Sequence, residues 1–175
     1  MILVTGFGPF PGVAHNPSGA LAESLAAQPP AGLELASTVL PVTFAGVPGA
    51  LSDFVEAHHA APPRALLSMG VHPGEGFRLE RCARARPSSG KVDDSGVVGQ
   101  DFDAGRERRT SLDLERLAAE LLPTAAALGG IRVSEDAGGY VCDWTYQHLL
   151  QHAERLGVPA LFLHVPPLER VELAA

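Results

Sequence analysis

Short apolar runs recur along the chain and predict the strands of a buried sheet. The run at 2–4 ends close to a glycine, and continuous apolar runs are typical of strands that are covered on both faces. Similar runs predict strands at 65–70, 131–133 and 160–165, and alternating apolar and polar residues predict strands at 33–42 and in the first half of 77–86. The regular spacing of these runs leaves room for helices between them.

Helix caps and apolar spacing predict the elements between the strands. Asn16 is a good N-cap residue, Pro17 suits the first helical position, and the Pro-rich segment 28–30 ends that helix. Further helices are predicted after Thr43, carrying Leu51, Phe54 and Val55 and ending at 62–63; at 112–122, capped by Ser111; and at 138–156. Residues 87–110 are rich in turn formers and predict a long loop with room for a small hairpin.

Strands that alternate with helices indicate an α/β domain with a largely parallel sheet. Ligands of such sheets bind at the carboxyl ends of the strands. That rule directs attention to the loop 6–12, the loop 70–76 and His164, which all follow or end an apolar strand.

Composition and charge exclude several classes of protein. The 175 residues carry 13 Lys and Arg against 20 Asp and Glu, for a net charge of −7, which argues against binding of nucleic acid. A hydrophobic content of 46% argues against disorder. Two cysteines make no disulfide framework, and no apolar stretch approaches the ~20 residues that span a bilayer. The N-terminus lacks the features of a signal peptide, so we expect a cytoplasmic protein that does not associate with membranes.

The glycine-rich loop 6–12 does not follow the dinucleotide-binding pattern, which spaces its glycines one and then two residues apart. Phe7 and Phe10 give it two aromatic rings. The loop is therefore either a tight turn between a strand and a helix or an aromatic wall of a binding pocket.

His148 and His152 lie four residues apart on a predicted helix and share one face, which is a spacing used by metal ligands. The residue after His148 is Leu149, whereas a zinc peptidase helix needs a glutamate there. We favour a solvated helix face over a metal site, and keep a metal-dependent hydrolase as an alternative function.

Cys142 lies near the start of the last predicted helix, where the helix dipole favours a thiolate. His164 ends a strand and could serve as the base for a thiol. Such a pair needs a third group to orient the imidazole, and Glu80 on a predicted strand is the best placed carboxylate. The competing carboxylates are Asp93, Asp94 and Asp136. Each of these residues could equally serve the core, and spacing does not choose among the carboxylates.

Together these segments resemble the pyroglutamyl peptidase family, cysteine peptidases that remove an N-terminal pyroglutamate from peptides. The matching stretches are 2–10, 16–17, 40–42, 79–83, 134–143 and 163–166. The resemblance implies a three-layer α/β/α sandwich with a mixed, mostly parallel sheet. It also implies a cytoplasmic enzyme that needs no cofactor or metal, acts on pyroglutamyl peptides and can form a homo-oligomer.

The resemblance also assigns roles to individual residues. It implies that Cys142 is the nucleophile, His164 the general base and acid, and Glu80 the carboxylate that orients His164. The residues implied to contact the pyroglutamyl group are Phe7, Phe10, Tyr140 and Val71.

Three departures from the family accompany this resemblance. An arginine that the family links to the active site aligns with Gly90, so Lys91 or a realigned Arg86 would have to replace it. Asp143 stands where the family usually has Asn. Only nine residues follow Pro166, so we expect residues 1–175 to form one domain without the family's usual C-terminal helix. A member with altered or lost activity is the main alternative.

Overall fold

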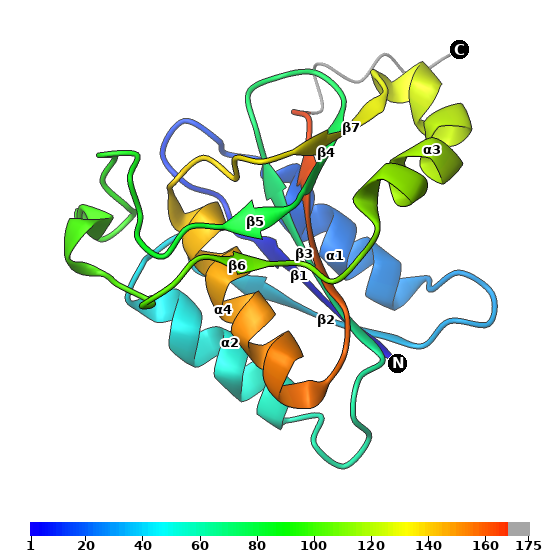
Figure 1. Ribbon diagram of the computed structural model, residues 1–175, viewed down its shortest axis with the longest axis horizontal. Coiled ribbons are helices and arrows are strands. Elements are labelled where there is room, and N and C mark those ends of the chain that lie inside the picture. The colour runs from blue at the N-terminus through cyan, green and yellow to red at the C-terminus, as the bar shows by residue number, and fades with distance from the viewer. Residues whose placement is uncertain (168–175) are drawn as a thin grey trace.

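A six-stranded mixed sheet forms the centre of the computed structural model, which describes residues 1–167 (Figure 1). The strands are β1 (Ile2–Phe7), β2 (Leu35–Leu40), β3 (Ala65–Val71), β4 (Phe77–Glu80), β7 (Ile131–Ser134) and β8 (Ala160–Val165), in the order β2-β1-β3-β8-β4-β7. Every neighbouring pair is parallel except β4 and β8, which are antiparallel. The predicted mixed, mostly parallel sheet is confirmed.

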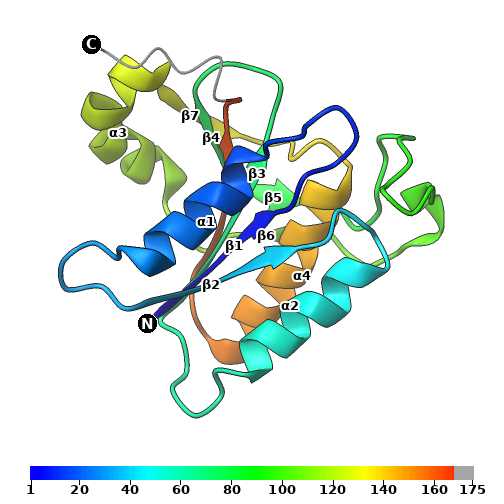
Figure 2. The same cartoon turned by 180° about the vertical axis from the view of Figure 1, so that it is seen from behind.

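Helices cover the sheet. The helices α2 (Gly46–Glu56) and α4 (Val141–Leu156) pack against each other, and α4 covers β3 and β8. The helix α1 (Pro17–Ala27) covers β1, β2 and β3 and lies in front of them when the molecule is seen from behind (Figure 2). The helix α3 (Leu114–Ala125) packs on β7 and β4 at the far edge. The predicted α/β sandwich class is thereby confirmed.

The predicted helix starts are right at Asn16 and wrong at Ser111. The Asn16 side chain accepts a hydrogen bond from the amide of Ser18, and Pro17 opens the helix. In α3 the cap is Asp113, whose carboxylate accepts from the amide of Arg116. Either residue type can cap a helix, so the sequence alone did not separate the two.

The second helix is shorter than predicted. The Thr43 hydroxyl accepts a hydrogen bond from the amide of Gly46, where α2 begins, and the helix ends at Glu56 rather than at 62–63. Turns bonded through His58 and His59 continue the chain to the proline pair.

The predicted strand at 77–86 divides into two. Only β4 joins the central sheet, while β5 (Cys82–Ala83) pairs antiparallel with β6 (Arg108–Arg109). The predicted loop at 87–110 is otherwise irregular, with a 3-10 turn η1 (Gly99–Asp101) and a bridge between Val92 and Val98. A second 3-10 turn, η2 (Ala126–Leu128), extends α3.

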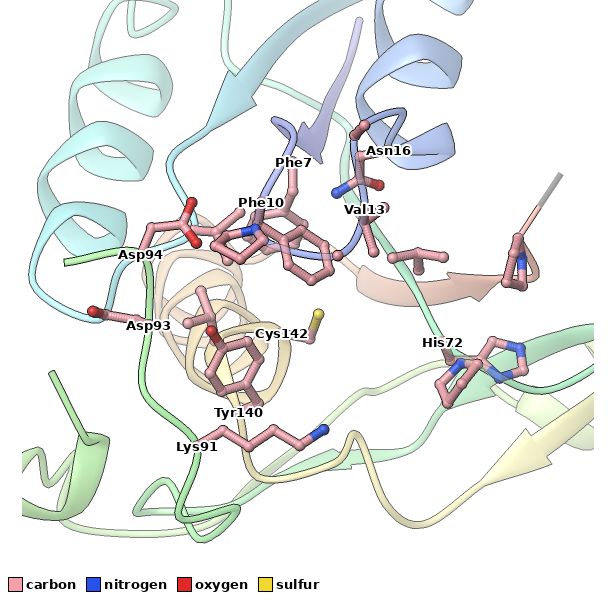
Figure 3. Close-up of a pocket in the computed structure, with 18 of the residues that line it drawn as sticks. Phe7, Phe10, Val13, Asn16, His72, Lys91, Asp93, Asp94, Tyr140 and Cys142 are labelled. Atoms are coloured by element: carbon pink, nitrogen blue, oxygen red, sulfur yellow. The ribbon is translucent and has the colours of Figure 1, made fainter. Parts of the chain in front are cut away.

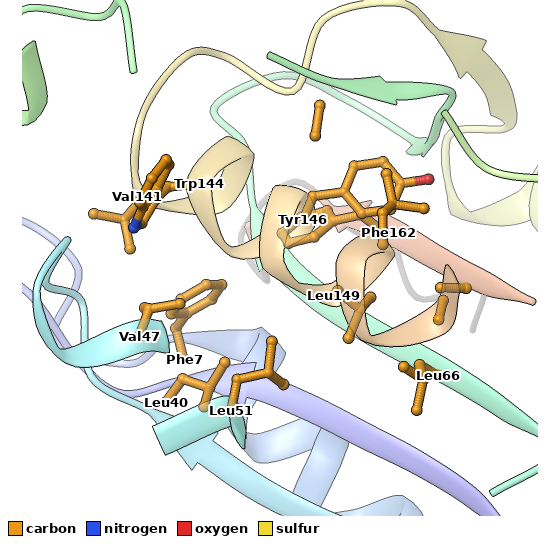
Figure 4. Close-up of a cluster of buried hydrophobic side chains, with 14 of the residues drawn as sticks. Phe7, Leu40, Val47, Leu51, Leu66, Val141, Trp144, Tyr146, Leu149 and Phe162 are labelled. Carbon is orange, nitrogen blue, oxygen red and sulfur yellow. The ribbon is translucent and has the colours of Figure 1, made fainter. Parts of the chain in front are cut away.

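The main hydrophobic core lies between the sheet and the α2–α4 layer (Figure 4). Its largest fully buried side chains include Tyr146, Phe44, Phe162 and Leu51. Within residues 1–167 no helix combines the length and apolarity needed to cross a membrane. The single domain predicted for 1–175 stays a prediction, and its last residues, 168–175, lie outside the described residues.

We predict that Leu51→Ala lowers the free energy of unfolding by about 2–5 kcal/mol, because it leaves a cavity in a closely packed core. Leu51 is 1% exposed. Chemical denaturation measures the effect, and Leu122→Ala on α3 is the control because Leu122 is 49% exposed. The control should change stability by less than about 0.5 kcal/mol. Equal losses in both variants would contradict the assignment of the core.

Candidate active site

The helix α4 presents Cys142 in its first turn, one residue after Val141. Two glycines with positive φ, Gly138 (93°) and Gly139 (62°), turn the chain into this helix. The first amides of a helix have no acceptor within the helix, so they favour an anion near the half-buried thiol. The local sequence therefore places Cys142 beside the free amides of the helix start.

Gly70 on β3 makes room for the thiol. A Cβ atom built on Gly70 would lie 2.8 Å from the Cys142 sulfur and 2.9 Å from the ring of Phe162. Gly70 pairs in register with His164 on β8. The absence of a side chain at Gly70 thus lets Cys142 approach the sheet beside His164.

His164 and Glu80 form a buried hydrogen-bonded pair across the antiparallel strands β8 and β4. The distance from His164 Nδ1 to Glu80 Oε1 is 2.7 Å, and the two residues are 5% and 0% exposed. Because Nδ1 donates to the carboxylate, Nε2 is the ring nitrogen left for Cys142. Burial alone would lower the pKa of His164, but the effects of Cys142 and of the Glu80 carboxylate outweigh it and raise the pKa to about 9.

Two of the three competing carboxylates are engaged elsewhere. Asp93 accepts hydrogen bonds from the amides of Phe44, Ser95 and Val97 and so fastens its own loop. Asp136 accepts from Arg84 and from the amide of Gly138. Asp94 is exposed. Among residues 1–167, Glu80 is the carboxylate that meets His164.

A cavity of about 850 Å³ opens beside Cys142 (Figure 3). The four residues predicted to contact the substrate all line it, namely Phe7, Phe10, Val71 and Tyr140. Phe7 is 3% exposed and belongs to the core, whereas Phe10 is only partly buried and is the more accessible ring. An apolar cavity with few polar groups suits a small uncharged ligand.

The glycine-rich loop is fastened to the start of α1. Asn16 donates to the carbonyl of Gly8 (2.9 Å), and the amide of Phe7 donates to the Ser18 hydroxyl (3.1 Å). A Cβ atom on Gly6 would lie 2.1 Å from the Ser18 carbonyl oxygen, so the close approach requires glycine. The loop is both a tight turn and an aromatic wall of the cavity.

Tyr140 ties the loop that contains Lys91 to the cavity. Its hydroxyl donates to the carbonyl of Val92 (2.9 Å). Lys91 lines the cavity, whereas Arg86 forms an ion pair with Asp103 and is not among the lining residues. Of the two candidates to replace the family's arginine, the structure brings only Lys91 to the cavity. Gly90 has a positive φ of 67° and open space around it.

His72 is a cavity residue that the sequence analysis missed. It is 4% exposed, and its ring centroid lies 5.8 Å from that of His164. Its Nδ1 accepts from the amide of Gly74 (3.0 Å) and its Nε2 donates to the carbonyl of Gly76 (2.9 Å), and burial lowers its pKa. His72 is therefore a neutral wall of the cavity. Its place in the loop after β3 was the available signal.

His148 and His152 lie outside this cavity. His148 packs edge-on against Trp144, with ring centroids 4.5 Å apart, and burial lowers its pKa to about 4. His152 contacts Arg155 through Nδ1 (3.0 Å). Both are half-buried, so this helix face is only partly solvated. Over the described part of the chain, no three His, Cys, Asp or Glu side chains are grouped as a metal site.

Comparison with known proteins identifies the family of the chain. The family model described as pyroglutamyl peptidase matches residues 1–174. A pyrrolidone-carboxylate peptidase of Gloeobacter violaceus is 31% identical over 173 residues, which cover 95% of this chain and 82% of the relative.

Solved structures agree. The crystal structure of a pyrrolidone carboxyl peptidase from Fervidobacterium islandicum superposes with a TM-score of 0.84 at 26% identity, covering 99% of this chain and 85% of that one. That of a pyrrolidone carboxyl peptidase from Thermus thermophilus superposes with a TM-score of 0.79 at 32% identity, covering 97% of this chain and 86% of that one.

We predict that Gly70→Ala slows alkylation of Cys142 by iodoacetamide by about tenfold or more, because the new methyl group displaces the thiol from His164. Mass spectrometry of the labelled cysteine gives the rate. Gly49→Ala on α2 is the control, since a Cβ there meets nothing within 4 Å. Equal rates in the two variants would show that Gly70 does not position the thiol.

Proposed function

Because the chain belongs to the pyroglutamyl peptidase family, we propose that it hydrolyses the peptide bond that follows an N-terminal pyroglutamate. The observation that carries the proposal is the buried 2.7 Å pair of His164 and Glu80 beside a thiol at the edge of an aromatic cavity. The proposed catalytic residues are Cys142, His164 and Glu80. A cytoplasmic location and assembly into a homo-oligomer stay predictions.

The proposed reaction proceeds through an acyl-enzyme. The Cys142 thiolate attacks the pyroglutamyl carbonyl carbon while His164 carries the proton as imidazolium. The carbon–nitrogen bond then breaks, and the departing peptide nitrogen takes the proton from Nε2 of His164. In the second half, His164 accepts a proton from water as that water attacks the thioester. The carbon–sulfur bond breaks, pyroglutamate leaves, and the thiolate–imidazolium pair is restored.

Glu80 has a separate role in this scheme. Its carboxylate accepts the Nδ1 proton of His164, which fixes the tautomer that aims Nε2 at the sulfur and stabilises the imidazolium. The negative oxygen of the tetrahedral intermediate needs donors, and the free amides in the first turn of α4 are available for it.

Selectivity in this scheme comes from the aromatic part of the cavity. Pyroglutamate has no charged α-amine, so its flat lactam can bind between Phe10, Phe7 and Tyr140. A free N-terminal ammonium would be desolvated against these three rings, none of which carries a charge to pair with it. We propose that the backbone at Val71, which ends β3 at the cavity, hydrogen-bonds the lactam.

Release of a fluorophore from a pyroglutamyl amide tests the function. Wild type should turn the amide over, and Cys142→Ala should abolish turnover because the acyl-enzyme cannot form. Cys82→Ser is the matched control: Cys82 is buried and bonds the Glu135 carbonyl through sulfur (3.3 Å), outside the cavity. The control should keep activity near wild type. Absence of turnover in wild type, or turnover in Cys142→Ala, would refute the proposal.

The pH dependence tests the role of Glu80. The pKa of His164 is raised to about 9, so the imidazolium persists to that pH and activity should decline above it. Glu80→Gln removes one of the interactions that raise this pKa, so the decline should begin at a lower pH. We expect kcat to fall about a hundredfold as well. A pH–rate profile of Glu80→Gln that matches wild type would count against the assigned role.

A further inference from the structure

Asp143, the residue after the proposed nucleophile, is 2% exposed and accepts three hydrogen bonds. Its Oδ1 accepts from the amide of Arg84 (2.9 Å), and its Oδ2 accepts from the amide of Gly139 (3.1 Å) and from the Arg84 guanidinium (3.4 Å). A carboxylate can satisfy all three donors. An asparagine amide would direct its own NH₂ group at one of them, so this site requires an acid.

Arg84 joins two carboxylates that flank the turn before α4. Its guanidinium lies 2.8 Å from Asp136 as well as against Asp143. Asp136 in turn accepts from the amide of Gly138 (2.7 Å). We refer to Arg84, Asp136 and Asp143 as the Arg84 network. Its two carboxylates accept hydrogen bonds from the amides of Gly138 and Gly139, and Arg84, which follows β5, holds both carboxylates.

Gly139 has little freedom inside this network. A Cβ atom there would lie 2.2 Å from the Ser88 hydroxyl and 3.2 Å from the Arg84 guanidinium. Its carbonyl accepts from the amides of Ser88 (2.8 Å) and Ser89 (3.0 Å). The residue that follows Gly139 is Tyr140, whose ring lines the cavity. The Arg84 network therefore helps to fix the position of that ring.

We propose that Asp143 and Arg84 are positioning residues of the active site: the ionised Asp143 carboxylate, held by Arg84, fixes the turn that places Tyr140 and Cys142. The inference rests on the proposed function for its catalytic readout. Neither residue touches the cavity, so both act through the turn. Loss of the carboxylate's charge would release the amide of Gly139 and weaken the hold on both cavity residues.

The network also makes the site sensitive to acid. Burial raises the pKa of Asp143 to about 6, against the opposing effect of its bonds to Arg84 and Gly139. The other titratable or charged groups around it are Asp136, which raises this pKa further, and Cys82 of β5. Protonation of Asp143 therefore sets in as the pH falls towards 6, and should disorder the turn at that point.

The experiment compares Asp143→Asn, Arg84→Met and Arg84→Lys with wild type by pH profiles of kcat and KM on a pyroglutamyl amide. Wild type should lose kcat/KM below about pH 6. Asp143→Asn should have kcat/KM lowered about tenfold to a hundredfold at pH 7.5. Its pH profile should lack the loss of kcat/KM below about pH 6, which we call the acid limb. Arg84→Met should shift the limb to higher pH, and Arg84→Lys should restore most of the activity. Arg116→Met, which removes a guanidinium paired with Glu120 on the surface of α3, is the control and should match wild type.

An Asp143→Asn variant with wild-type kcat/KM and an unchanged acid limb would overturn the proposal. If that variant does not fold, judged by circular dichroism, the shift of the limb in Arg84→Met and the rescue by lysine decide instead. Alkylation of Cys142 by iodoacetamide separates this inference from the proposed function. If wild type hydrolyses no amide but Arg84→Met still slows alkylation, only the proposed function fails; equal alkylation rates would refute the positioning role as well.

Discussion

The side chain of Glu80 is completely buried, and burying a carboxylate is costly unless a partner accepts its charge. His164 is that partner: in the antiparallel pair of β4 and β8, Glu80 lies opposite Phe162, two residues before His164, and its carboxylate meets His164 Nδ1. The His164 pKa rises from its usual 6.5 to about 9 in the folded protein. The pair therefore stabilises the fold fully below pH 6.5, and that contribution is lost as the pH rises through about 9.

A further hydrogen bond at Glu80 ties the sheet to the helix that carries the cysteine. The Tyr146 hydroxyl on α4 donates to the backbone carbonyl of Glu80 (2.8 Å), so α4 and β4 are joined at the residue that carries the buried carboxylate. Gly70 lets Cys142 come down onto β3 at the register position of His164. The position of the thiol is thus determined from the sheet side by packing and from the other side by the Arg84 network.

Much of this was readable from the sequence because it depends on local signals. The apolar runs predicted β1, β3 and β8, and the Asn16–Pro17 cap predicted the start of α1. The boundary between β4 and β5 was not readable, because the strand leaves the sheet to pair with β6, a contact set by residues far along the chain. His72 and the Arg84 network were missed for the same reason. Their roles depend on partners that no spacing rule identifies. Spacing likewise did not choose Glu80 over Asp93 and Asp136; the family resemblance made that choice, and the fold brings Glu80 to His164.

The few side chains of the active site depend on the whole sheet because their partners lie far away along the chain. Glu80 and His164 are 84 residues apart, and Arg84 and Asp143 are 59 apart, so neither pair forms without the elements between them. Exposed ion pairs such as Arg116 with Glu120 join neighbours on one helix and contribute little to the fold. The buried carboxylates of Glu80 and Asp143 are the opposite case, since each would be left unpaired in the interior if its element shifted. The thiol is for that reason correctly placed only when β4, β8 and α4 are correctly packed.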